Sequence, residues 1–318
     1  MESTYNSVQI KKKVLQLGKG QDDAYHGTAI NPETGEQYNY GIITDGHGPN
    51  DTVSYIRGIM TQHIDTILNS ENPHLEIQSR LDEINKARIE NIDQINTFYR
   101  NIKKNIDFST YSGGSTFVLS KLYSNRVEVF SIGDSAVYVM INNDIVYHNP
   151  IHNWDNDAER ERIQSRTDIT INVKFQSIPH IISPQRNGIA KVASIEYFDN
   201  NRNCLTQLAP TQSLGHNSIT QFAPEKITIP FESTDHVKII LASDGLWDVF
   251  STHHPEDIGR MNEMDGEQLA DLAESRWKQE WEVAYSIDKP DVIYKEKSHY
   301  PENGYDDVSV ITMVRPPI

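Results

Sequence analysis

The sequence predicts an α+β fold in which helices pack outside antiparallel β-sheets. Short apolar runs rich in β-branched residues predict strands, and they lie at 38–44, 115–122, 126–132, 135–141, 144–148, 236–242 and 308–314. A helical period replaces this pattern between Asp51 and Asp107 and again from about Gly266 to Tyr285. Since long helices interrupt a series of closely spaced strands, we expect the helices to cover the outer faces of a sheet or a pair of sheets.

Each predicted element has its own local signal. The tetrapeptide "INND" lies between the runs 135–141 and 144–148, and it predicts a hairpin turn. The first helical region carries apolar residues at helical spacing, namely Val53, Ile56, Met60 and Ile67, followed by Leu81, Ile84, Ile95, Phe98, Ile102 and Ile106. The later helix has one apolar face, made of Leu269, Leu272, Ala273, Trp277 and Trp281.

One long segment, at about 165–222, lacks a clear period and is rich in turn-forming residues. Nothing in it resembles a linker between two cores, and long irregular segments in compact domains are typically functional excursions. The chain has no internal repeat. We therefore predict a single domain over residues 1–318, with a flap-like excursion at about 165–222.

The charge balance restricts the classes of partner. The chain has 29 basic and 45 acidic residues, which gives a formal net charge of −16. A polyanion would be repelled, so we expect neither a nucleic-acid nor a membrane partner. No apolar run approaches the roughly 18 residues needed to span a bilayer, and the first residues, "MESTYNSVQIKKK", lack the apolar stretch of a signal peptide. We expect a cytoplasmic protein and a monomer.

Cysteine usage excludes further mechanisms. Cys204 is the only cysteine, so the chain has no disulfide framework and no thiolate zinc site. A cysteine phosphatase would need an arginine six residues after its nucleophile, but that position is Pro210. We expect Cys204 to be a packed side chain.

Acidic residues recur beside predicted strands and turns. They are Asp22 and Asp23 in "GQDDAYHG", Asp45 in "GIITDGHGPN", Asp134 in "VFSIGDSAVYVM", Asp244 in "KIILASDGLWDVFS", and Asp306 and Asp307 in "GYDDVSVITM". One such residue alone is ordinary turn chemistry. Carboxylates that converge at one end of a sheet would repel each other unless cations lie among them, and oxygen ligands select Mg²⁺ or Mn²⁺. The pattern indicates metal-assisted hydrolysis, with a phosphate ester as the expected substrate.

Several ordered motifs strongly resemble the metal-dependent protein phosphatase family PP2C (PPM). They are "QDDAY", "DGHG", "SGGSTFVL", "VFSIGDS", "HNWDNDAERERI", "LAPTQSLGH", "FAPE", "IILASDGLWDVFS" and "YDDVSVITMV", and they span about residues 18–314. The resemblance implies a four-layer αββα sandwich, in which helices flank two antiparallel sheets and a binuclear metal site lies at one end.

The resemblance also implies the ligands of two Mg²⁺ or Mn²⁺ ions. Asp45 would bridge the ions, and the carbonyl group of Gly46 would complete one coordination sphere. Asp244 and Asp306 would hold the first ion. Asp22 would hold the second, directly or through water, although the family usually has a longer glutamate at this position.

Further roles carry over from the same motifs. Asp134, Asp244 and Asp248 resemble the set that holds a weaker third ion in many members, and Asp23 would orient metal-bound water. His47 is a candidate general acid near the leaving oxygen. The alternative is that His47 only makes a hydrogen bond within its turn. We expect the "SGGST" segment, Gly113 to Thr116, to serve close packing beside the site.

The sequence departs from the family pattern at several positions. The arginine that binds substrate phosphate in the family corresponds to Gly18, and Lys19 is the nearest basic side chain. Ala136, Gln212 and His216 stand where family members commonly carry Arg, Arg and Asp. Asp307 replaces the usual Asn beside Asp306, with an effect that the sequence leaves open.

These features favour an enzyme that removes phosphate from Ser/Thr side chains of phosphorylated proteins, by in-line attack of a metal-bridging hydroxide. The alternative is a pseudophosphatase that keeps the fold and acts as a binding or regulatory module. Pseudoenzymes of this type usually lose metal-binding aspartates, whereas Asp45, Asp244 and Asp306 are present. A phosphomonoesterase acting on small molecules is a third possibility.

Overall fold

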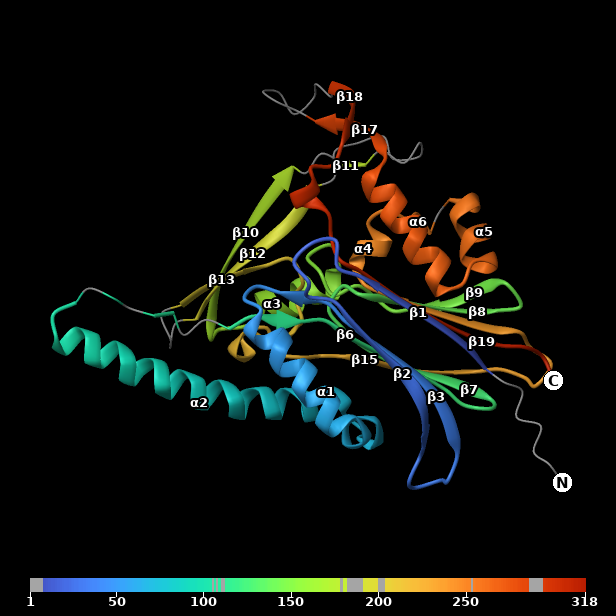
Figure 1. The fold of residues 1–318 in the computed structure, drawn as a ribbon, viewed down its shortest axis with the longest axis horizontal. Helices are drawn as coiled ribbons and strands as arrows, with labels where there is room; N and C mark the ends of the chain where they lie inside the picture. The colour runs from blue at the N-terminus through green and yellow to red at the C-terminus, as the bar shows by residue number, and fades with distance from the viewer. Residues whose placement is uncertain are drawn as a thin grey trace.

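Two antiparallel five-stranded sheets form the centre of the protein (Figure 1). The computed structural model describes residues 8–104, 106, 108–109, 112–177, 180–181, 191–199, 204–252, 254–285 and 294–318. The first sheet has the order β1(Gln9–Leu15), β19(Val308–Arg315), β16(Val237–Ala242), β8(Ala136–Ile141) and β9(Asp144–His148). The second has the order β15(Glu225–Pro230), β7(Arg126–Ile132), β6(Phe117–Leu122), β3(Gln37–Thr44) and β2(Asp23–Ile30).

An apolar layer joins the two sheets. Val118 and Val129 of the second sheet belong to the same buried cluster as Val139, Leu241 and Ile311 of the first. The central strands β6 and β16 are buried at every position, which explains why they are apolar except at Ser120, Lys121 and Lys238. Helices then cover the outer face of each sheet, so the predicted αββα sandwich is confirmed.

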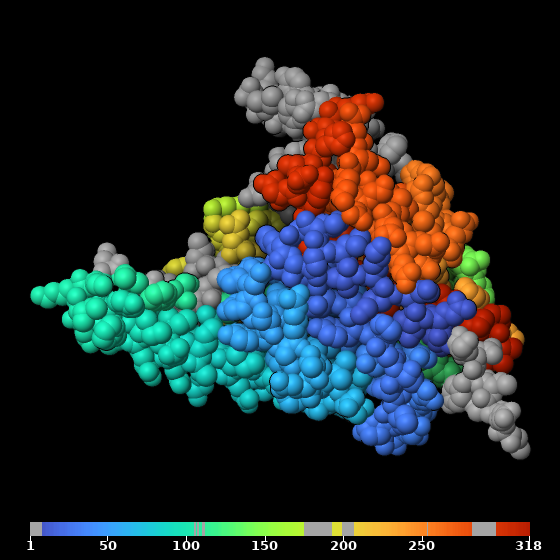
Figure 2. All heavy atoms as spheres, viewed as in Figure 1, coloured from blue at the N-terminus to red at the C-terminus, as the bar shows by residue number. Residues whose placement is uncertain are grey.

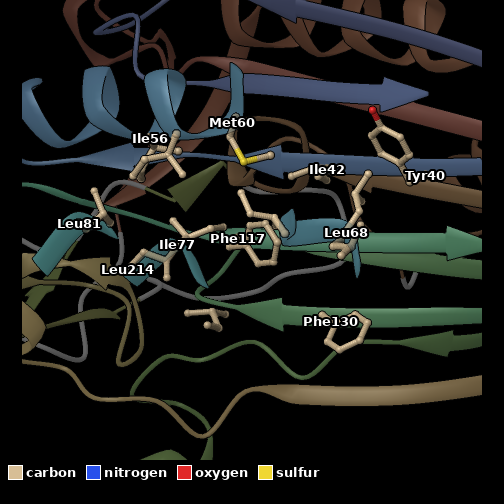
Figure 3. Close-up of a cluster of buried hydrophobic side chains, with 14 of the residues drawn as sticks. Tyr40, Ile42, Ile56, Met60, Leu68, Ile77, Leu81, Phe117, Phe130 and Leu214 are labelled. Atoms are coloured by element: carbon tan, nitrogen blue, oxygen red, sulfur yellow. The ribbon is translucent and has the colours of Figure 1, made fainter. Parts of the chain in front are cut away.

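The outer layers are helical on both sides. Helices α1(Asp51–Asn69) and α2(Pro73–Asn101) pack on the second sheet. Figure 3 shows part of this contact, with Met60 of α1 close to Ile42 and Phe117 of the sheet. On the other side lie α4(Asp244–Trp247), α5(Pro255–Glu263) and α6(Gly266–Lys278). No helix among the described residues is long and apolar enough to cross a membrane.

Helix α2 follows the predicted apolar face for only part of its length. Ile77 and Leu81 are fully buried, whereas Ile95 and Phe98 are 37% and 59% exposed. The distal half of the helix runs out beyond the sandwich (Figure 1, Figure 2). The helical region predicted up to Asp107, which lies outside the described residues, ends at Asn101.

The hairpin predicted from "INND" is confirmed. Asn142 and Asn143 have φ values of +52° and +74° between β8 and β9. Positive φ at both central residues defines the turn type that matches the twist of a two-residue hairpin.

The helix predicted to reach Tyr285 is wrong beyond Lys278. Residues Glu280–Tyr285 form β17, which pairs with β18(Tyr294–His299). The indole of Trp281 donates a hydrogen bond of 2.7 Å to the carbonyl oxygen of Arg276. Trp281 therefore satisfies a carbonyl at the helix end instead of extending the apolar face, although its spacing fits a helix.

The segment predicted as an excursion contains a third sheet. Strands β10(Ile169–Ser177), β12(Lys191–Asp199) and β13(Cys204–Leu208) are antiparallel neighbours. Ile195, Tyr197 and Leu208 pack with Ile163 of the preceding helix α3(Asp157–Gln164). The described part of the segment thus has a small core of its own.

Candidate metal centre

Five aspartates lie where strands of the two sheets begin or end. Asp22 precedes β2, Asp45 follows β3, Asp134 lies between β7 and β8, Asp244 begins α4 after β16, and Asp306 comes shortly before β19. One carboxylate oxygen from each of Asp45, Asp134 and Asp244 lies within 4.8 Å of the others. The charges of Asp22 and Asp306 act on this group as well. The predicted convergence is therefore present in the structure.

Burial and mutual repulsion make these carboxyl groups hard to ionise. Burial, followed by the charges of Asp244 and Asp306 among others, raises the pKa of Asp22 to about 8. Burial and the charge of Asp244 raise the pKa of Asp306 to about 7 and hold that of Asp45 well above its usual value. Burial also raises the pKa values of Asp134 and Asp244 to about 6. A cation placed among these groups would lower all of these values.

Several carboxylate oxygens of this group have no hydrogen-bond partner among the described residues. One buried Oδ1 atom in each of Asp22, Asp134 and Asp244 has no hydrogen-bond partner among the described residues. Unpartnered buried carboxylate oxygens cost free energy unless a donor or an ion satisfies them. An all-oxygen, anionic donor set fits Mg²⁺ or Mn²⁺. The residues present therefore fit the ions that the family resemblance implies.

Backbone contacts fix the position of Asp45. The backbone N–H of Thr116 donates to the carbonyl oxygen of Asp45 at 2.8 Å. In return, the N–H of Asp45 donates to the Thr116 hydroxyl at 3.0 Å. At the next residue, Gly46, a Cβ atom would lie 2.2 Å from Cγ2 of Val53. Only glycine fits there, so α1 can pack directly against the turn that carries Asp45.

Asp307 has a structural role that sequence reasoning left open. Its carboxylate accepts backbone N–H groups from Gly18 at 2.6 Å and from Gln21 at 2.7 Å. The aspartate thus holds the loop 18–21 against the start of β19. Because Asp22 follows this loop directly, Asp307 helps to place a member of the carboxylate group.

The position of the missing arginine has no room for a side chain. A Cβ atom on Gly18 would lie 2.7 Å from the carbonyl oxygen of Tyr305. The neighbouring Lys19 is exposed, and its charge acts on both His47 and Asp306. Lys19 is therefore a basic side chain whose charge reaches the carboxylate group, and its role toward phosphate stays a prediction, while Gly18 is required by packing.

Two predicted site residues lie outside the closest group of carboxylates. Asp23 forms an ion pair of 2.5 Å with Nε of Arg57 on α1, because adjacent residues of a strand face opposite sides. Asp248 is exposed at the end of α4, and its charge contributes to the raised pKa of the half-buried Tyr300. Neither belongs to the closest group of Asp45, Asp134 and Asp244. Their roles toward water and a third ion stay predictions.

His47 lies beside the carboxylate group with one ring nitrogen unpartnered. Its Nε2 atom is buried and has no hydrogen-bond partner among the described residues. Its Nδ1 atom lies 3.0 Å from Nε2 of His216. Burial, and then the charge of Lys19, lowers the pKa of His47 to about 4. In the sequence His216 is a departure from the family pattern, but nothing there pairs it with His47, because 169 residues separate the two.

The other departures are structural. The amide of Gln212 donates to Oε1 of Glu159 at 2.8 Å, and Oε2 of Glu159 accepts from Nη2 of Arg162 at 2.8 Å. Arg162 therefore supplies a positive charge beside a position where the family commonly has arginine. Ala136 is buried at the start of β8. The glycines of the "SGGST" segment also pack closely, as predicted, since a Cβ on Gly113 would lie 2.3 Å from the carbonyl oxygen of Pro49.

Comparison with solved structures gives the same fold. A sex-determining protein of C. elegans is 18% identical, with a TM-score of 0.51, and the match covers 98% of this chain and 65% of that one. This chain thus spans less than two thirds of that structure. The serine/threonine phosphatase PstP/Ppp of Mycobacterium tuberculosis is 12% identical, with a TM-score of 0.51 and coverage of 98% and 99%.

A third solved structure agrees with these two. Serine-threonine phosphatase 2C from Toxoplasma gondii is 15% identical, with a TM-score of 0.50 and coverage of 98% of this chain and 96% of that one. Comparison with curated proteins gave no match. The sequence of residues 29–282 matches the family described as protein phosphatase 2C. Since this match covers most of the chain and the sandwich is the same, the protein belongs to the protein phosphatase 2C family.

Proposed function

We propose that this protein is a metal-dependent phosphatase that hydrolyses phosphoserine and phosphothreonine in protein substrates. The observation that carries the proposal is the group of buried and half-buried carboxylates, in which one buried oxygen each of Asp22, Asp134 and Asp244 has no partner among the described residues. Without cations, a group of this kind lowers the stability of the fold considerably. Such destabilising arrangements are found mainly where function requires them. Membership of the protein phosphatase 2C family supports the same conclusion.

The ligands follow from the site. Asp45, Asp22, Asp244 and Asp306 would hold two Mg²⁺ or Mn²⁺ ions, together with the carbonyl group of Gly46. Bound ions would offset the negative charge of the phosphate and activate water for in-line attack on phosphorus. A weaker third ion would lie toward Asp134 and Asp248.

Other side chains would act on the substrate itself. His47 would carry a proton on Nε2 and give it to the leaving oxygen as the P–O bond breaks. Lys19 would attract the phosphate as a point charge, since Gly18 has no room for the arginine that the family uses there. Asp23 would act on the attacking water only if it turned away from Arg57, which makes it the weakest assignment.

A binding module without catalysis is the alternative, and one observation favours it. Gly18 stands where the family has its phosphate-binding arginine, so the protein lacks a strong contact to the substrate phosphate at this position. The aspartates favour the enzyme, because a pseudophosphatase has no need to retain this buried charge. The expected cytoplasmic location, monomeric state and lack of a nucleic-acid or membrane partner remain part of the proposal.

A metal-dependence assay tests the proposal. Phosphoserine-peptide hydrolysis should require Mn²⁺ or Mg²⁺ and should stop in excess EDTA. Calorimetric titration with Mn²⁺ on the same sample separates the alternatives. Metal binding without turnover would indicate the pseudophosphatase, and undiminished turnover in EDTA would rule out the metal-dependent reaction.

A further inference from the structure

Gln21 joins the loop before β2 to the turn that follows β3. The residue is 4% exposed. Its backbone carbonyl oxygen accepts from the N–H of Gly46 at 3.2 Å. Its side-chain amide donates to the carbonyl oxygen of Gly48 at 2.9 Å and to Oδ1 of Asn50 at 2.6 Å. One buried residue therefore binds the turn 46–50 at three points.

The same residue is also fixed by the segment that precedes β19. The backbone N–H of Gln21 donates to Oδ2 of Asp307 at 2.7 Å. On the other side, a Cβ atom at Gly46 would lie 3.0 Å from both the carbonyl oxygen and the Cβ atom of Gln21. Only glycine allows the two backbones to approach this closely. Gln21 thus holds three segments of the chain together, and each segment carries at least one of the candidate ligands.

Asn50 does not play its usual role at the start of a helix. It is the N-cap residue of α1, where an asparagine side chain typically accepts from a backbone N–H of the first turn. No backbone N–H of α1, all of whose residues the structure describes, donates to this side chain. Its Oδ1 atom accepts from Gln21 instead. Departures from local rules are expected mainly at functional sites, so this contact serves the position of the turn and not the helix.

We propose that Gln21 is a positioning residue of the metal centre. It fixes the carboxylate of Asp45 and the carbonyl group of Gly46 relative to the loop that carries Asp22. The inference rests on the proposed function. Ligands from separate segments bind an ion tightly when their spacing is already set, and partners that orient ligands typically contribute about 10- to 100-fold to metal affinity or activity. The side-chain amide of Gln21 is engaged with the turn and is not itself a ligand.

Calorimetric titration with Mn²⁺ tests the proposal. Gln21→Met keeps the length of the side chain but removes both of its hydrogen bonds. It should weaken Mn²⁺ binding by about tenfold, the lower limit for the loss of a partner that orients ligands. Asn50→Ala removes only one of the two bonds from an exposed position, so it should fold normally and give a smaller loss. The double variant should bind no worse than Gln21→Met alone, because both changes break the same contact.

A matched control separates positioning from a general loss of stability. Gln212 is also buried, and its amide also donates to two acceptors, Oε1 of Glu159 at 2.8 Å and the carbonyl oxygen of Ala223 at 3.1 Å. Gln212→Met should make the protein less resistant to urea, as Gln21→Met does, but it should leave the affinity for Mn²⁺ unchanged. An equal loss of affinity in the two variants would overturn the proposal.

Turnover of a phosphoserine peptide gives a second measurement. Gln21→Met should need about tenfold more Mn²⁺ for its half-maximal rate, and excess Mn²⁺ should restore most of kcat, because the ligands themselves are intact. An unchanged Mn²⁺ affinity in Gln21→Met would overturn this inference alone. Wild-type protein that binds Mn²⁺ without turnover would overturn the proposed function alone, since the comparison of affinities needs no substrate. Wild-type protein that binds no Mn²⁺ would overturn both.

Discussion

Asp257 and Asp244 are aspartates on neighbouring helices beside the first sheet, but their surroundings are opposite. The carboxylate of Asp257 accepts hydrogen bonds from Arg260 at 2.9 Å, from both Nη atoms of Arg276 at 3.0 and 2.5 Å, and from the backbone of Ser251 at 2.9 Å. Burial alone would raise its pKa, but these partners lower the pKa below its usual value. Asp257 thus has its cations built into the chain.

Asp244 has the contrary arrangement. Its nearest ionisable neighbours include Asp45 and Asp134, and burial followed by the charge of Asp134 raises its pKa to about 6. A buried carboxylate among carboxylates is destabilising unless an ion compensates. The difference separates structural from functional carboxylates. A structural carboxylate has its hydrogen-bond and ion-pair partners within the protein, whereas a functional one leaves oxygens free to bind an ion.

The largest difference between Asp244 and Asp257 is expected when each is replaced by asparagine and turnover and stability are compared. Asp244→Asn should lower phosphopeptide turnover by several orders of magnitude, because it removes a ligand charge without changing volume. The metal-free protein should lose no stability, since repulsion is relieved. Asp257→Asn should instead lower stability. It should reduce the free energy of unfolding by about 3–5 kcal/mol, because two arginines lose their counter-charge.

Kinetics and urea unfolding of the two variants, each in EDTA, check this contrast. The properly folded fraction of Asp257→Asn should keep near-normal kcat. Near-normal activity of Asp244→Asn would show that its carboxylate is not a ligand. A strong loss of metal-free stability in Asp244→Asn would show that the group is satisfied by the protein itself.

The pH dependence should differ between the two kinds of carboxylate. In the metal-free protein the carboxylate group has pKa values raised from 3.8 to about 6–8. A raised pKa favours folding below the unfolded value of 3.8, and this contribution is lost as pH rises through about 6–8. Mg²⁺ requires the deprotonated ligands, so its stabilising effect should grow over the same range.

Thermal unfolding with and without Mg²⁺, at pH 5.5 and pH 8, measures this effect. The rise in Tm caused by Mg²⁺ should be clearly larger at pH 8. The lowered pKa of Asp257 stabilises the fold at pH values above its pKa in the unfolded state. Asp257 should therefore change Tm only by a loss of stability at acidic pH. A shift in Tm that is independent of pH would mean that protons and ions do not compete for the same oxygens.

A smaller effect is expected at Lys19, a cation that the chain does bring to the carboxylate group. Lys19→Ala should raise KM for a phosphopeptide by about tenfold, because a charge-assisted contact is worth about 1.5 kcal/mol at its lower limit. Affinity for Mn²⁺ should not weaken, since removing a positive charge from the site favours cations. Steady-state kinetics and calorimetry measure the two effects, and an unchanged KM would place Lys19 away from the phosphate.

The sequence predicts the central part of this fold well and its borders less well. Fully buried strands such as Phe117–Leu122 are mostly apolar, which makes them easy to recognise. The edge strands Gln9–Leu15 and Glu225–Pro230 were not predicted, because each has one exposed face and carries charged residues such as Lys11 and Lys226. The spacing of Trp281 predicts a helix, but the pairing of β17 with β18 determines its structure.

The candidate site divides in the same way. The aspartates could be predicted because each lies beside a strand or turn that local sequence reveals. The contact between His47 and His216 and the bonds from Asp307 to the loop 18–21 could not, because they join residues far apart in the chain. Likewise, the lack of room for a side chain at Gly18 could not be predicted, because it depends on how the loop at Tyr305 packs against this position.

The order of strands in the first sheet has a consequence for the timing of synthesis. Strand β19, near the end of the chain, lies inside that sheet between β1 and β16, and Asp306 comes shortly before it. The sheet cannot close until residues up to Arg315 have left the ribosome, and contacts between such distant segments form slowly. The nascent chain therefore remains without a complete carboxylate group until Asp306 and β19 have been synthesised, which is long after Asp22 and Asp45 have left the ribosome.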